Sequence, residues 1–125
     1  MNASVIVSIF HIICVVPLLL FVGFQRADTP EWLYNVLFGL GILIVIYHGI
    51  KAMIRYYSKS LLLWINIIHF FYIGPLLIWI GFFGKKTQRP AYELLIIAGF
   101  GALGYHLKNI IVRTQTITAV TKGEE

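Results

Sequence analysis

Four histidines stand inside apolar stretches of the sequence, where an imidazole is costly to bury and needs a partner. They are His11, His48, His69 and His106. The first and third lie about as far from the start of their stretches as the second and fourth lie from the ends of theirs. At about 1.5 Å per helical residue, all four fall roughly 10 Å below one membrane face. We therefore expect one layer of histidines that faces the interior of a helical bundle.

Three kinds of chemistry are open to such a layer. Histidines on facing helices ligate haem b in small membrane cytochromes, and imidazoles also bind metal ions. A titratable ring beside Tyr47 or Tyr105 is one step of a proton or ion path. In the third, structural interpretation, neutral histidines bond to one another, to tyrosine or to Asn66 and hold the helices in register. We favour the structural interpretation because no Asp or Glu accompanies the histidines at their depth.

Other residues repeat at helical spacing around the histidines. Asn66 and Tyr72 flank His69 at three-residue spacing and so share its face. In the second and fourth apolar stretches, a glycine lies seven residues before the histidine and an arginine seven residues after it, a spacing close to two helical turns. These residues are Gly41 and Arg55 around His48, and Gly99 and Arg113 around His106. The arginines are expected at the level of the lipid headgroups, where they hold phosphate. The glycines, together with Gly101 and Gly104, predict close helix packing.

Each histidine of the first and third apolar stretches, His11 and His69, is followed six residues later by a proline. Pro17 and Pro75 lack a backbone N–H, so they are expected to kink their helices and to weaken the hydrogen bonds to the carbonyls of Ile13 and Phe71.

The composition places these residues in a membrane. Of 125 residues, 59% are hydrophobic and 12% charged, and the formal net charge is +5. A soluble domain has about 25% charged residues. Four apolar stretches are each long enough to cross about 30 Å of hydrocarbon as a helix, and aromatic residues such as Tyr34 and Tyr92 are expected at their lipid–water boundaries. The stretches cover about residues 4–24, 33–54, 61–83 and 91–112.

The chain resembles itself at an offset of 58 residues. Residues 9–55 align without a gap on 67–113, with 14 identities that include two histidines, a proline and an arginine. We therefore predict an all-α membrane protein of four transmembrane helices, arranged as two tandem, parallel-related hairpins. The domains are the repeats 1–58 and 59–113, followed by a polar tail, 114–125, that is disordered or lies on the surface.

Charge suggests an orientation. Six of the ten basic residues lie on the side that holds both termini, which places the termini in the cytoplasm. The basic residues are split between two faces and form no stripe, so nucleic acid is not an expected partner. The expected partners are the bilayer and other membrane proteins or a second copy of the chain.

The sequence contains no nucleophile triad, phosphate loop or zinc motif, and we expect no enzymatic activity. The leading functional hypothesis is a non-enzymatic structural or assembly component of a membrane or membrane complex, with no cofactor. The alternatives are an electron-transfer subunit that binds haem b or a metal ion through the four histidines, and a small proton or ion channel or transporter.

The segments 66–81 and 99–106, with their histidine, proline and glycine positions, look like small duplicated four-helix membrane proteins of unknown activity encoded by large DNA viruses. The resemblance implies a viral or organelle membrane and no mechanism. The first repeat departs from it, with Val16 in place of Gly74 and Ile46 in place of Gly104.

Overall fold

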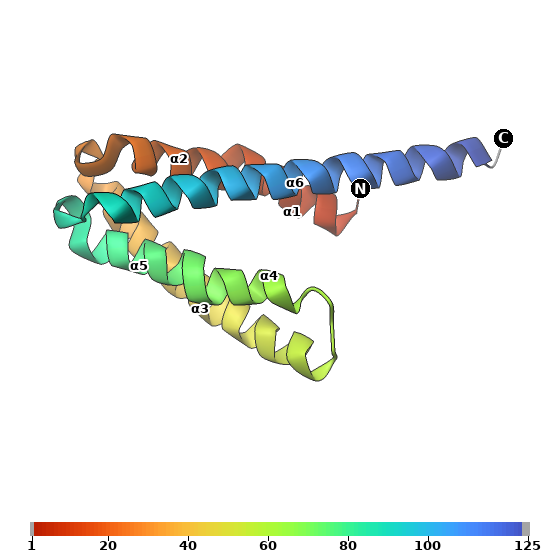
Figure 1. Cartoon of the computed structure of the whole chain (residues 1–125), viewed down its shortest axis with the longest axis horizontal. Helices are drawn as coiled ribbons and strands as arrows, with labels where there is room; N and C mark the ends of the chain where they lie inside the picture. The colour runs from red at the N-terminus through yellow and green to blue at the C-terminus, as the bar shows by residue number, and fades with distance from the viewer. Residues whose placement is uncertain (1, 124–125) are drawn as a thin grey trace. The chain divides into compact units, whose positions relative to one another are not determined.

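The computed structural model describes residues 2–123 as an all-α chain with four helices long and apolar enough to cross a membrane (Figure 1). They cover Ala3–Asp28, Glu31–Tyr57, Leu63–Lys86 and Arg89–Gly123. The predicted fold class is confirmed. In chain order the elements are α1 (Ala3–Phe10), η1 (His11–Val15), α2 (Val16–Gln25), η2 (Arg26–Asp28), α3 (Glu31–Tyr57), α4 (Leu63–Ile68), η3 (His69–Ile73), α5 (Gly74–Phe83), η4 (Gly84–Lys86) and α6 (Arg89–Gly123).

The odd-numbered spans each contain one turn of π-helix, where the sequence predicts a proline kink. In η1 and η3 the backbone N–H of the residue just before the proline bonds to the histidine carbonyl five residues back: Val16 to His11, and Gly74 to His69. A π turn inserts one extra residue into the helix, and such turns are frequent at functional sites. In both spans it begins at the histidine.

Local chemistry explains where the spans begin and turn. The side chain of Asn2 accepts a hydrogen bond from the N–H of Ser4 at 2.8 Å and caps α1. Pro90 lies in the first turn of α6, where its missing N–H costs no bond. Between spans, Arg26 in η2 and Gly84 in η4 adopt positive φ values of 53° and 54°, the left-handed geometry that lets the chain reverse within three residues.

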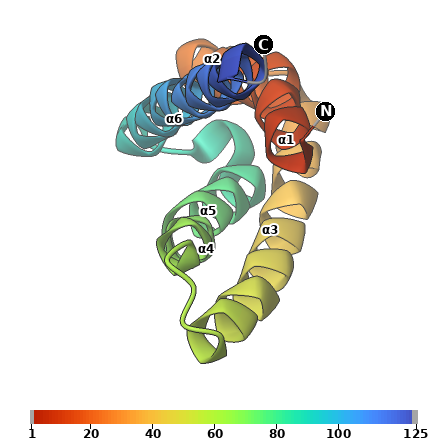
Figure 2. The same cartoon turned by 90° about the vertical axis from the view of Figure 1, so that its right-hand side faces the viewer.

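The described residues divide into two compact units, and each is described by itself. The second unit, residues 25–94, pairs α3 with the α4–η3–α5 helix (Figures 1 and 2). Its core contains Leu37, Leu77 and Ile80, all at most 2% exposed. The helices approach so closely that a Cβ on Gly41 would lie 2.7 Å from the backbone nitrogen of Ile78.

The first unit contains residues 2–24 and 95–123, and pairs the α1–η1–α2 helix with α6 (Figure 1). Its closest approach is again at a glycine, because a Cβ on Gly99 would lie 2.7 Å from Leu20 Cδ2. Each unit therefore combines one span from residues 1–58 with one span from 59–113.

The outer surface is apolar. Large side chains such as Phe71, Met53 and Ile97 are 72%, 62% and 63% exposed. A surface of this kind is stable only against hydrocarbon, so the chain is a small multi-pass protein in contact with a lipid bilayer.

The polar tail is helical where the structure describes it, so the disordered alternative is wrong up to residue 123, and a tail that lies on the surface stays a prediction. α6 continues through the threonine-rich segment to Gly123. The hydroxyls of Thr114 and Thr116 donate to the carbonyls four residues earlier, at 2.8 and 3.0 Å, and Thr118 and Thr121 do the same. These bonds give each threonine hydroxyl a partner within α6 itself. Residues 124 and 125 lie outside the described part.

We expect Gly41→Ala to destabilise the protein by about 1–3 kcal/mol, because the added methyl group has no space against the backbone of Ile78. The matched control is Gly39→Ala on the same helix, where a Cβ meets nothing within 4 Å. Its effect should stay within about 1 kcal/mol. Thermal unfolding in detergent measures both, and equal losses in the two variants would contradict the close approach.

Candidate functional site: two stacked histidine pairs

The structure brings the four predicted histidines together as two pairs, one in each unit. In the second unit the rings of His48 on α3 and His69 on η3 stack with centroids 4.2 Å apart and planes 16° from parallel. In the first unit His11 on η1 and His106 on α6 stack at 4.3 Å and 23°. Each pair therefore joins the two spans of its own unit.

The histidine at the start of each π turn bonds to its own helix. Nδ1 of His11 lies 2.8 Å from the carbonyl oxygen of Val7, and Nδ1 of His69 lies 2.7 Å from that of Ile65. A carbonyl oxygen only accepts, so Nδ1 carries a proton in both rings. These bonds fix each ring against the turn that precedes it.

The partner histidine of the second unit belongs to a chain of hydrogen bonds that starts at an arginine. Arg55 donates to Asn66 Oδ1 at 2.6 Å and to the carbonyl of Leu62 at 3.2 Å. Because the guanidinium can only donate, it fixes the orientation of the Asn66 amide, and the amide nitrogen then donates to His48 Nδ1 at 2.9 Å. Asn66 is 2% exposed. The Arg55–Asn66–His48 chain is called relay 2 below.

The first unit contains a similar chain with one more link. Arg113 Nε donates to Asn109 Oδ1 at 3.2 Å, and the Asn109 amide nitrogen donates to Ser8 Oγ at 2.8 Å and to Ser4 Oγ at 2.9 Å. Ser8 Oγ lies 3.0 Å from His106 Nδ1. Ser8 accepts from the amide and still has one proton and one lone pair, so it can either donate to His106 Nδ1 or accept from it. We call the Arg113–Asn109–Ser8–His106 chain relay 1.

Relay 2 determines the protonation of His48. A ring nitrogen that accepts a hydrogen bond carries no proton, so His48 is neutral and protonated at Nε2. The stacked pair of the second unit therefore combines one ring protonated at Nδ1 with one protonated at Nε2. Adding a proton to His48 Nδ1 would set two donors against each other.

Other predicted site residues have different surroundings. Tyr47 and Tyr105 stand edge-on to the histidine that follows each in sequence, at 5.0 and 5.1 Å between ring centroids. Tyr72 donates instead to the carbonyl of Leu94, at 2.6 Å. Gly101 and Gly104, unlike Gly41 and Gly99, have nothing within 4 Å of an added Cβ.

Asn109 was not among the predicted site residues, and the contact between Tyr34 and Tyr92 was not predicted either. Tyr34 and Tyr92, expected at a lipid boundary, are 1% and 2% exposed, and their hydroxyls lie 2.8 Å apart. Tyr34 also donates to the carbonyl of Arg26 at 2.7 Å, and Tyr92 lies 3.2 Å from that of Gly84. Their identity at the 58-residue offset was the signal that they share one environment.

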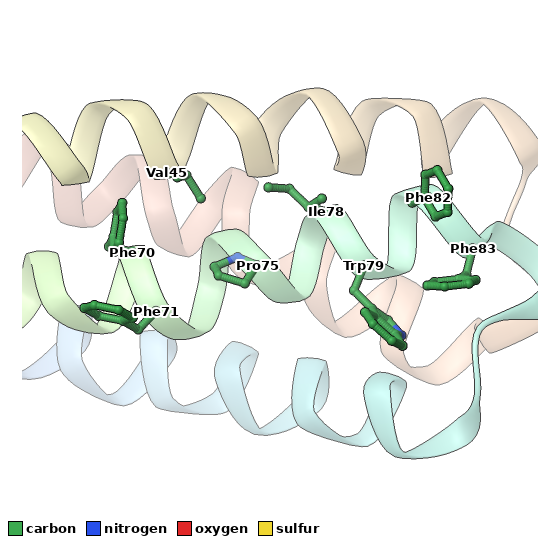
Figure 3. Close-up of a pocket in the computed structure, with 8 residues that line it drawn as sticks. All are labelled: Val45, Phe70, Phe71, Pro75, Ile78, Trp79, Phe82 and Phe83. Atoms are coloured by element: carbon green, nitrogen blue, oxygen red, sulfur yellow. The ribbon is translucent and has the colours of Figure 1, made fainter.

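The second unit also has an open apolar groove of about 560 Å³. Figure 3 shows Val45 reaching it from α3, while the other lining residues come from the η3–α5 helix: Phe70, Phe71, Pro75, Ile78, Trp79, Phe82 and Phe83. No charged or carboxamide side chain lines it. The groove therefore offers contact area to an apolar molecule and no group for catalysis.

Within residues 2–123, no three His, Cys, Asp or Glu side chains are grouped closely enough to hold a metal ion. No known protein family, curated protein or solved structure matches the chain. The fold and the site define a small multi-pass membrane protein with two stacked histidine pairs.

The hydrogen bonds predict the tautomers of three of the four rings. ¹⁵N NMR of histidine-labelled protein in bilayers should show a protonated Nδ1 in His11 and His69 and an unprotonated Nδ1 in His48. In Asn66→Asp the carboxylate accepts from both neighbours, so His48 should acquire a proton on Nδ1 while His106 stays unchanged. An unprotonated Nδ1 in His48 of that variant would disprove the assigned polarity of relay 2.

The tyrosine pair predicts non-additive stability. Tyr34→Phe and Tyr92→Phe should each cost about 0.5–1.5 kcal/mol, because each removes a buried hydroxyl. The double variant should cost less than the sum, since both single changes remove the bond between the two hydroxyls. Additive losses on thermal unfolding would mean that the two hydroxyls do not interact.

Proposed function

We propose that this protein is a non-enzymatic structural or assembly component of a membrane or membrane complex. The observation that carries the proposal is that Nδ1 of each histidine already has a partner within its own unit: two backbone carbonyls, one asparagine and one serine. Side chains engaged in this way fix helix register, and interhelical hydrogen bonds are a common stabilising element of membrane bundles.

A haem-binding role fits this arrangement less well. Axial imidazoles stand on opposite faces of a porphyrin and point at one iron from two sides. Here the rings of each pair lie face to face, 4.2 and 4.3 Å apart between centroids, with no space for a macrocycle between them. Haem b binding would require the two spans of a unit to separate.

A proton path along the relays is also disfavoured. Passing a proton on requires groups that can both take up and release one, whereas arginine stays protonated and an amide does not readily exchange its proton along the chain. Relay 2 contains both kinds of group next to the histidine. Its polarity therefore suits anchoring of the ring.

Two further assignments belong to the proposal. The excess of basic residues on the side of the termini supports a cytoplasmic location for both ends. The 58-residue offset shared by the π turns, the short turns between spans and the histidine pairs supports an internal duplication. The resemblance to duplicated viral membrane proteins makes a viral or organelle membrane the proposed site, with other membrane proteins or a second copy as partners.

Purified protein tests the proposal directly. We expect a colourless, metal-free sample and no proton flux in liposomes. His69→Ala should lower the unfolding temperature, at a cost of about 1 kcal/mol for the lost interhelical contacts, and should reduce the amount of any larger complex seen on native gels of the source membrane. The matched control is Ile13→Ala, which alters a side chain that is 66% exposed.

Three results would overturn it. One is a Soret band that His69→Ala removes, and another is stoichiometric metal lost in the same variant. The third is a proton flux that disappears when the histidines are replaced.

A further inference from the structure

The contacts of the two units correspond residue by residue at the 58-residue offset. His11 stacks on His106 as His69 stacks on His48, and the close approach of Gly99 to Leu20 corresponds to that of Gly41 to Ile78. The π turns and the short turns between spans correspond too, with bounds shifted by the same offset. One helix interface has therefore been formed twice from two similar sequences.

Both interfaces combine spans from different halves. The odd span of the first half pairs with the even span of the second, and the odd span of the second half pairs with the even span of the first. A hairpin that pairs in this reciprocal way with another hairpin is self-complementary, as the surfaces of a two-fold dimer are.

The relays differ in the helix that supplies the asparagine, and relay 1 has Ser8 as an additional link. Relay 2 takes its asparagine, Asn66, from the third span. The even-numbered span of that unit has Lys51 at the position that Asn109 occupies in the first unit, 58 residues later. Relay 1 takes it from the even span, as Asn109, and has the small Ser8 at the position equivalent to Asn66. Each interface thus contains one asparagine.

We propose that the two halves of the chain are versions of one self-complementary hairpin and that each half has the other as its partner. The position of the relay asparagine decides which helices pair.

Pairing within a half would not give one asparagine per interface. The odd and even spans of the first half would bring Ser8 to Lys51 and leave Arg55 without an amide. The spans of the second half would bring Asn66 and Asn109 to one site. A single buried asparagine is known to fix register and partner choice between helices, and discrimination depends on the wrong pairing being worse. Only the pairing across halves completes both relays.

The first test moves the asparagine within the second unit. Asn66→Ser should lower the unfolding temperature, because Arg55 and His48 lose their common partner. Adding Lys51→Asn should restore most of the loss, since the double variant reproduces the relay of the first unit. The matched control, Asn66→Ser with Lys51→Ala, removes the same charge without supplying an amide and should restore nothing. A double variant no more stable than Asn66→Ser alone would overturn the proposal.

The second test changes the order of the halves and keeps every span. The permuted chain runs from Leu61 to Arg113, continues through a copy of the loop Tyr56–Ser60 into Ala3–Arg55, and ends with residues 114–125. That loop should close the first unit because it already joins the equivalent positions of the second.

A disulfide reports whether the first unit has formed in the permuted chain. Cβ of Leu19 lies 3.5 Å from an ideal Cβ on Gly99, within the range of disulfide geometry. Leu19→Cys with Gly99→Cys, in a Cys14→Ser background, should therefore cross-link in both chain orders. Leu19→Cys with Gly101→Cys should cross-link in neither, because nothing lies within 4 Å of a Cβ on Gly101. A cross-link in the native order that is missing from the permuted chain would show that the halves are not interchangeable.

Discussion

The cost of an unpartnered polar group in hydrocarbon governs this structure. Each span carries at least one group that water would satisfy outside a membrane, and within the bilayer only another part of the protein can do so. The histidine rings, the amides of Asn66 and Asn109 and the guanidinium groups of Arg55 and Arg113 find such partners, which lie on the paired span or one turn away on the same helix. Apolar packing alone would leave the helices free to slide, since lipid tails are as apolar as leucine. The polar relays define one register.

The π turns concern the other histidine of each stacked pair, because they begin at His11 and His69. The side chains of His11 and His69 bond through Nδ1 to the carbonyl four residues earlier. The extra residue of each π turn then rotates the remainder of the span relative to the ring. As a result the histidine can stack on its partner while Leu19 and Leu77, further along, remain at most 2% exposed in their cores. Proline after the turn costs little, because the backbone hydrogen bonds are already rearranged there.

Much of this architecture was readable from the sequence. Hydropathy located all four spans, because a span long enough to cross hydrocarbon leaves a continuous apolar record. The offset alignment identified the histidines, glycines and tyrosines that share equivalent environments. The pairing of the helices could not be predicted in this way, because hydropathy does not depend on which helices contact each other. Adjacent spans were therefore assumed to pair within each repeat. Asn109 was overlooked since its equivalent is Lys51, so no identity marked it. The helical tail was missed because composition suggested disorder, whereas its threonine hydroxyls bond to their own helix.

The tyrosine pair shows where the equivalence of the halves must end. Two hydroxyls provide two protons, while three short contacts compete for them: Tyr34 with Arg26 O, Tyr92 with Gly84 O, and the two hydroxyls with each other. No arrangement of two protons can satisfy these contacts and treat both tyrosines alike. The distances record the outcome, since Tyr34 is 2.7 Å from its carbonyl and Tyr92 is 3.2 Å from its own. Even a perfectly duplicated sequence would break its symmetry at this hydrogen bond, and the mirror-image proton arrangement would be a second state of nearly equal energy.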